Sequence, residues 1–227
     1  MANSATATFS GRSLLWALVK NQGSPTEPKN IGWGDSTVTA SANANVALFK
    51  PQTEARVAGT STMISTSQLA DTYQVTGTIT CLVGTKTITE AGLFDTTTAA
   101  SSTTIATSSQ SAAATTITLT ATIGPATNNF YIQVENETEL VTAGQGSTTM
   151  TVTRSVLGST AAAHQTGVPV TAGGDGLAHD NATLGGQTAS NSTMVTRGGS
   201  LAYHADFAGI GLAVNDSIAF TWTVQLT

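Results

Sequence analysis

The sequence predicts an all-β protein. We expect an antiparallel β-sandwich of the jelly-roll or immunoglobulin-like type, interrupted by a small inserted β domain, with one short helix near the N-terminus. Three observations lead to this prediction. Only 9% of the residues are charged, against about 25% in typical domains, and a helical bundle needs Leu, Glu, Lys and Arg in quantity. Large apolar side chains alternate with Thr in several segments. A stretch composed almost only of Thr, Ala and Ser, residues 96–115, separates two sets of such segments.

The helix is predicted over residues 11–20. Four apolar side chains recur there at helical spacing: Leu14, Leu15, Leu18 and Val19. Either Ser10 or Ser13 is positioned to cap its N-terminus. A glycine and two prolines between residues 23 and 28 then end it.

The main domain is expected to contain several half-buried strands. Residues 73–81 alternate apolar and polar side chains, as an antiparallel strand with one buried face does. Cys81 ends this segment and has no second cysteine to pair with, so we expect a small buried side chain. Residues 217–226 alternate most clearly, and 200–207 alternate as well. The turn signal Asn215-Asp216 lies between them, so the two segments are expected to pair as neighbouring strands.

The inserted domain is expected over residues 99–190, and the main domain over residues 1–98 plus 191–227. Short alternating segments near residues 117–121, 130–134 and 140–152 carry their own apolar face. The Thr/Ala/Ser-rich stretch and a Gly-rich stretch beginning at Gly173 are interpreted as the two linkers.

Composition and motifs exclude several functions. The net charge is -5, and the 8 basic residues are scattered, whereas nucleic-acid binding needs clustered Lys and Arg. The apolar run 14–19 is too short to span a bilayer, so no membrane partner is expected. No histidine has a metal-ligand spacing, and no nucleophile or phosphate-loop motif occurs. We therefore expect no enzyme activity, no catalytic residue, no metal and no cofactor.

Three acidic residues alternate along one segment, namely Glu135, Glu137 and Glu139. On one strand face they are able to bind a cation or to act as a glycosidase pair. An exposed polar face opposite the apolar residues of 130–134 explains the same pattern, and it is the interpretation we favour. His164 follows three alanines and is interpreted as a turn residue, and His179-Asp180 as a pair in a Gly-rich loop.

Four short blocks of the main domain resemble a family of structural proteins of tailed bacteriophages. They are PKNIGWG (28–34), EAR (54–56), ITEAGLFD (88–95) and NDSIAFTW (215–222). Members of this family are small β-rich virion proteins, described as head decoration or tail proteins. The resemblance covers about residues 11–98 and 195–227.

The inserted segment is similar to a second phage module, a small β repeat of tail and surface proteins. The blocks that carry this resemblance are FYIQV (130–134), ELVT (139–142), TVTR (151–154) and GSTAAAH (158–164). In that module the Arg and the Ala-Ala-His stretch recur in a loop or turn after a strand. The resemblance does not indicate a biochemical role for it.

The two resemblances imply a non-enzymatic virion protein, assembled in the cytoplasm of the bacterial host. We expect a capsid decoration (cement) protein that contacts the major capsid protein and copies of itself, as a trimer at local threefold sites. The alternative is a tail or fibre component that recognises the bacterial surface, and a polysaccharide depolymerase ranks third. Because aromatic residues are only 5% of the chain, an exposed one is a good anchor for a partner. The candidate partner contacts are Leu14, Leu15, Trp16, Leu18 and Trp33, and for each tryptophan a place in the core is the alternative.

Overall fold

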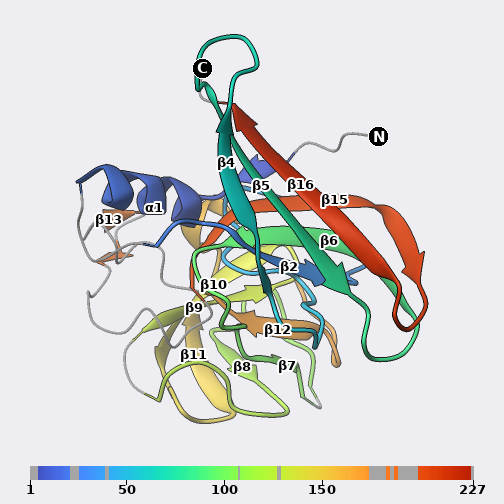
Figure 1. Ribbon diagram of the computed structural model, residues 1–227. Helices are drawn as coiled ribbons and strands as arrows, with labels where there is room; N and C mark the ends of the chain where they lie inside the picture. Colours follow the sequence, from blue (N-terminus) through green and yellow to red (C-terminus); the bar gives the residue numbers. More distant parts are fainter. Residues whose placement is uncertain are drawn as a thin grey trace.

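The structure is a computed structural model, and it describes residues 5–20, 26–38, 41–106, 108–126, 129–173, 183–184, 187–188 and 199–225. It is all-β, as predicted, and Figure 1 shows its elements in two groups, one above the other. The main domain contains β1 (Thr6–Ala7), α1 (Phe9–Lys20), β2 (Asn30–Gly34), β3 (Val57–Ala58), β4 (Thr60–Ile64), β5 (Thr72–Thr80), β6 (Lys86–Phe94), β15 (Leu201–Leu212) and β16 (Ser217–Gln225). The inserted segment contains β7 (Ser102–Thr104), β8 (Thr116–Thr118), β9 (Phe130–Val134), β10 (Glu137–Ala143), β11 (Thr149–Thr153), the 3-10 helix η1 (Val156–Gly158) and β12 (Pro169–Ala172). Two short strands, β13 (Thr183–Leu184) and β14 (Gln187–Thr188), pair antiparallel with each other.

The main domain is an antiparallel β-sandwich. One sheet has the strand order β1-β15-β6-β2-β3 and the other has the order β16-β5-β4. Ile31 and Leu93 of the first sheet share one buried cluster with Val75, Ile79 and Trp222 of the second. The alternation of β5 and β16 therefore produced the expected inward faces. Cys81 is buried in the same cluster, as expected.

The predicted pairing of 200–207 with 217–226 is wrong. β15 pairs with β6, whereas β16 pairs with β5 in the register that places Trp222 opposite Val75. The turn between them adopts a left-handed conformation at Asn215. The backbone N–H of Asn215 donates to the Cys81 carbonyl, and the Cys81 N–H donates to the Asp216 carbonyl. The chain thus passes from one sheet to the other at this corner. Period-two alternation shows that a segment is a strand but does not show which strand lies beside it.

The predicted helix is present as α1 and begins two residues earlier than expected. Its cap is Thr8, whose hydroxyl accepts a hydrogen bond of 2.9 Å from the backbone N–H of Gly11. Neither Ser10 nor Ser13 is the cap, because both lie inside the helix. No helix in the described ranges is long and apolar enough to cross a membrane.

The inserted segment forms an antiparallel sheet of its own, β7-β12-β9-β10-β11-β8. An isolated bridge between Ile105 and Leu119 joins its two edges, so the sheet curls into a small, nearly closed barrel. Part of the Thr/Ala/Ser-rich stretch interpreted as a linker belongs to this barrel, because it supplies β7 and the buried Ile105. The sequence did not predict this strand because its side chains are small and polar and show no apolar alternation. The Gly-rich stretch after Gly173 lies mostly outside the described residues.

The inserted barrel packs against a loop of the main domain. The backbone N–H of Val46 donates to Gln133 Oε1 at 3.0 Å, and the Thr138 hydroxyl donates to the Ala44 carbonyl at 2.7 Å. Ala44 and Val46 also share a buried apolar cluster with Tyr131 and other residues of the barrel. The two β units are therefore joined by a buried contact as well as by the chain between them.

Candidate functional site

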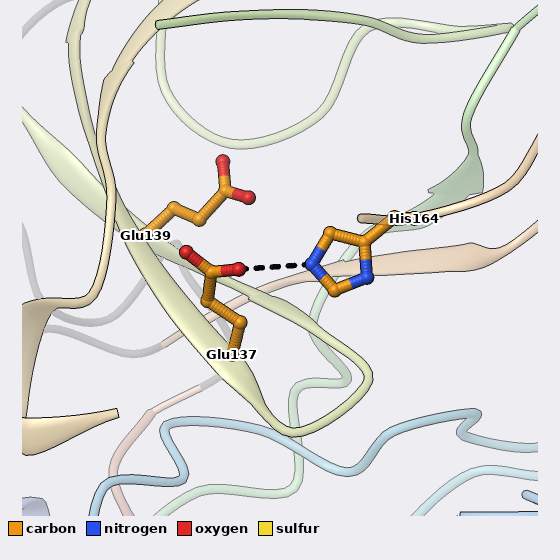
Figure 2. Close-up of side chains that lie close together, drawn as sticks. All are labelled: Glu137, Glu139 and His164. Carbon is orange, nitrogen blue, oxygen red and sulfur yellow. Dashed lines mark hydrogen bonds and ion pairs between the residues drawn. The ribbon is translucent and has the colours of Figure 1, made fainter. Parts of the chain in front are cut away.

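The barrel contains a buried cluster of charged side chains beside β10. Glu137 and Glu139 leave the same face of β10 and are 1% and 0% exposed, and His164 is 1% exposed. The expectation of an exposed acidic face is therefore wrong for both glutamates, and His164 is not a simple turn residue (Figure 2). Glu135 stands apart at the turn before β10, in a left-handed conformation, with its side chain 39% exposed.

Arg154 neutralises this cluster. Its Nε and Nη2 donate to the two carboxylate oxygens of Glu137 at 2.7 and 2.6 Å, which is the bidentate geometry of a strong ion pair. Its remaining hydrogen bonds go to backbone carbonyls, at 2.8 Å for Ser111 and 2.6 Å for Ala162. The guanidinium therefore ties two loops of the barrel to β10.

His164 bridges two carboxylates. Nδ1 lies 2.7 Å from Glu135 Oε2, and Nε2 lies 3.0 Å from Glu137 Oε2. Carboxylate oxygens only accept hydrogen bonds, so only an imidazolium with both protons donates to both. Burial by itself lowers the pKa of His164, but the bonds to Glu137 and Glu135 outweigh it, and this pKa is raised. His164 therefore acts as the second cation of the cluster.

The two buried glutamates have opposite protonation behaviour. Burial raises the pKa of Glu137, but the hydrogen bonds from His164 and Arg154 outweigh burial and lower this pKa to about 2. Burial raises the pKa of Glu139 to about 7, although Arg154 and a hydrogen bond from Gln110 oppose the rise. With Glu139 protonated, the two cations balance the carboxylates of Glu135 and Glu137, so the network of these five side chains carries no net charge.

The cluster offers ligand types that suit a divalent metal, but Arg154 takes the place of a cation. Glu137, Glu139 and His164 bring three ligand atoms within 4.8 Å of one another. Both oxygens of Glu137 already accept from the guanidinium, and further bonds come from the backbone N–H groups of Ser155 and Ala162. A metal here would displace or repel a buried arginine. The arrangement therefore functions as an internal ion network that fixes loops.

Glu135 connects the network to solvent. It lines a groove of about 390 Å³ at the junction of the two units. The main domain contributes Asp35, Phe49 and Lys50 to this groove, and the barrel contributes the segment 166–169. The Nδ1 proton of His164 thus faces a carboxylate that is partly exposed at this groove.

We predict that the barrel is more stable in mild acid than in mild base. Because the folded pKa of His164 lies above its ordinary value of 6.5, its contribution is complete below that pH and is lost as the pH rises through the folded pKa. Glu139 acts in the same direction, since ionising it costs stability between pH 4.5 and about 7. Glu137 acts oppositely, and its contribution is lost only as the pH falls from 4.5 towards about 2.

Hydrogen exchange of peptides from residues 102–172, at about pH 5.5 and about pH 8.5 after correction for the intrinsic rate, measures this effect. Protection should be higher at the lower pH, and His164→Gln should remove most of the difference above neutrality. The three tryptophans, Trp16, Trp33 and Trp222, all lie outside the barrel, so their fluorescence serves as the internal control. Equal or greater protection at the higher pH would contradict the assignment.

A second buried polar group holds the loop that contacts the barrel. His204 Nε2 lies 2.9 Å from Glu90 Oε2, its Nδ1 lies 2.9 Å from Asn45 Oδ1, and His204 and Glu90 are both 0% exposed. Glu90 also accepts hydrogen bonds from the backbone N–H groups of Phe49 and Lys50. Strands β6 and β15 thereby fix residues 44–50, and this loop carries Ala44 and Val46 to the barrel.

The structure separates the five candidate partner contacts into two groups. Leu14 and Trp33 are 0% and 2% exposed in the core of the main domain, so neither side chain lies at the surface. Leu18 is partly buried against the same core. Leu15 and Trp16 are exposed on the outer side of α1, with Trp16 at 59%. Only these last two present an apolar surface to a partner.

The sequence patterns did not indicate Arg154, Glu90 and His204 as organising residues. A signal was present, because in a chain with 9% charge each charged residue inside an apolar strand is unusual. His204 stands between Tyr203 and Ala205 in an alternating segment, and Glu90 stands next to Ala91 in another. Their partners come from residues 45–50, and sequence spacing does not indicate this proximity.

Fold and cluster together define a two-unit all-β protein in which buried charges hold loops in place. Comparisons of the chain with protein-family models, with curated protein sequences and with solved structures return no significant match. We therefore infer the function from the surface and the chemistry of this chain.

Proposed function

We propose that the protein is a non-enzymatic structural component of a tailed-bacteriophage particle, a decoration (cement) protein on the outer face of the capsid. The observation that carries the proposal is a surface poor in charge that exposes large apolar side chains at several places. The largest group lies on α1 (Leu15, Trp16 and Val19), and others lie on β4 and in the loop after it (Met63 and Leu69), at the turn after β5 (Leu82 and Val83), and on β15 and the turn after it (Ile210 and Val214). A cluster of exposed apolar side chains such as the one on α1 marks a contact with another protein.

The buried charges support the same proposal. Arg154 and His164 donate hydrogen bonds to carboxylates and carbonyls of the chain itself, and Glu90 bonds to His204 and to the loop 44–50. These groups stabilise a rigid two-unit body, as a subunit under mechanical load requires. The resemblance of the blocks 28–34 and 215–222 to phage structural proteins agrees with this role.

The mechanism is stabilisation by repeated contacts. Each subunit on a shell contacts capsid proteins through modest interfaces, and many copies together resist the pressure of the packaged DNA. On this proposal the outer face of α1, with Leu15 and Trp16, contacts the major capsid protein. The barrel projects from the main domain, and no nucleic acid or membrane takes part.

The copy number per particle tests the proposal. Particles of the phage that encodes this chain are purified, and the protein is quantified by mass spectrometry against the major capsid protein. A decoration protein should occur in hundreds of copies, and cryo-electron microscopy should place it on the capsid surface. A dozen copies or fewer would overturn the decoration role in favour of a tail or fibre component, and absence from the particle would overturn the virion role itself.

A further inference from the structure

The longest open sheet edge in the described part of the molecule belongs to β16. This strand of nine residues pairs with β5 on one side, and the backbone groups on its other side bond to no residue that the structure describes. The other end strands of the two sandwich sheets are shorter, at two residues for β1, two for β3 and five for β4. The part of β15 that β1 leaves unpaired, residues 205–212, is interrupted by a register shift between Asp206 and Ile210. The barrel closes its own edges through the bridge between Ile105 and Leu119. In Figure 1, β16 lies along one side of the sheet that extends away from the barrel.

Nothing in β16 protects this edge from pairing. Monomeric proteins guard long edges with charges, proline or bulges. The sequence of β16 is SIAFTWTVQ, which has no charge, no proline and no glycine, and its register with β5 is unbroken. Its apolar side chains are also incompletely covered, since Ile218, Phe220 and Val224 are only partly buried against the core. A strand placed beside β16 would cover the remainder.

The strand is complementary to itself. Antiparallel pairing centred on Thr221 places Phe220 opposite Trp222, and Ile218 opposite Val224. The same register places Ala219 opposite Thr223, and Thr221 opposite its own copy. Residues directly opposite in an antiparallel pair lie on the same face, so apolar side chains meet on one face and Thr and Ala on the other.

We propose that β16 pairs with β16 of a second copy of this chain about a two-fold axis at Thr221. The pair joins two three-stranded sheets into one continuous six-stranded sheet. Four or five residue pairs exchanging two bonds each give about eight to ten backbone hydrogen bonds, and an ordinary specific interface has about ten. The interface does not depend on the capsid assignment, because it follows from the edge alone.

The mass of the purified full chain tests this interface. Light scattering after size exclusion should give two chains for the wild type. Thr221→Lys should give one chain, because the axis places two like charges directly opposite each other. Thr221→Glu should do the same, and mixing the Lys and Glu variants should restore a pair. Thr76→Lys is the matched control, since Thr76 is exposed on the same face one strand further in, opposite Thr221 of its own chain.

Each outcome decides the question. A wild type that is a single chain at every concentration, or a Thr221→Lys variant that remains paired, would overturn the proposal. A mass of three chains would replace the two-fold pair with a threefold arrangement, and a variant pair that fails to re-form on mixing would also count against it. Circular dichroism shows whether each variant keeps its fold.

Cysteine cross-linking tests the register independently. The single native cysteine, Cys81, is buried and does not compete. Thr221→Cys should link two chains through a short thiol cross-linker. Ala219→Cys should not, because the two copies of residue 219 lie four residues apart along the strands, about 13 Å. Linkage through position 219 but not through 221 would overturn the two-fold register.

Discussion

Replacing Arg154 with Ala should lower the free energy of unfolding of the barrel by about 3–5 kcal/mol, because removing one partner of a buried ion pair leaves an uncompensated charge. Glu137 would lose both of its guanidinium hydrogen bonds while remaining fully inside the protein. The carbonyls of Ser111 and Ala162 would lose their donor at the same time. The lost interactions all lie within the barrel, so the loss of stability should be found in the barrel and not in the main domain.

Hydrogen exchange of peptides from residues 102–172 measures this loss, and tryptophan fluorescence follows the main domain separately. Arg154→Lys should be intermediate, because an ammonium keeps the charge but not the bidentate geometry. The control is Lys50→Ala, which breaks an exposed pair with Asp35 and should cost less than about 1 kcal/mol. Unchanged protection in the Arg154→Ala barrel would show that the network does not support it.

Replacing Trp222 with Asp should unfold the main domain. Trp222 is 7% exposed and lies in the core cluster that both sheets share. Losing a buried aromatic side chain costs about 3–5 kcal/mol, and burying an unpaired carboxylate adds several more. A typical domain is stable by about 5–15 kcal/mol in total, so the sum is comparable with the whole stability.

The control for this variant is Thr223→Asp. Thr223 is the next residue of β16 and its side chain is exposed, so the same charge should cost about 1 kcal/mol or less there. Denaturant titrations followed by tryptophan fluorescence and by circular dichroism compare the two variants. Trp222→Phe should retain most of the stability. A folded Trp222→Asp protein with a normal midpoint would mean that β16 does not close the sandwich core.

Local pattern was enough for the strands with large side chains. The alternation in β5 and β16 predicted both the strands and their inward faces, because a period of two places every second side chain in the core whatever the neighbour is. It did not predict that β16 pairs with β5 while β15 pairs with β6. Pairing depends on where the chain turns, and a single left-handed residue at Asn215 sends it into the other sheet.

The candidate site shows the same division more sharply. Glutamates that alternate along a strand show the same pattern whether their face is exposed to solvent or buried. From the sequence we therefore expected the exposed face. Glu137 and Glu139 are buried because Arg154 and His164, which lie 15 to 27 residues further along the chain, pair with them. Their charges neutralise the face and allow the barrel to close over it. Periodicity in the sequence does not indicate contacts between segments that lie far apart in the chain.

By itself, the sequence determined an all-β sandwich, a short helix, a second set of strands and a chain with few charges, since composition and periodicity depend only on local residues. Only the tertiary structure decided which charges are buried together, that a loop of the main domain holds the barrel, and that β16 ends its sheet with an open edge. These features depend on contacts between residues far apart in the chain, whose free energy exists only once the backbone has closed those distances.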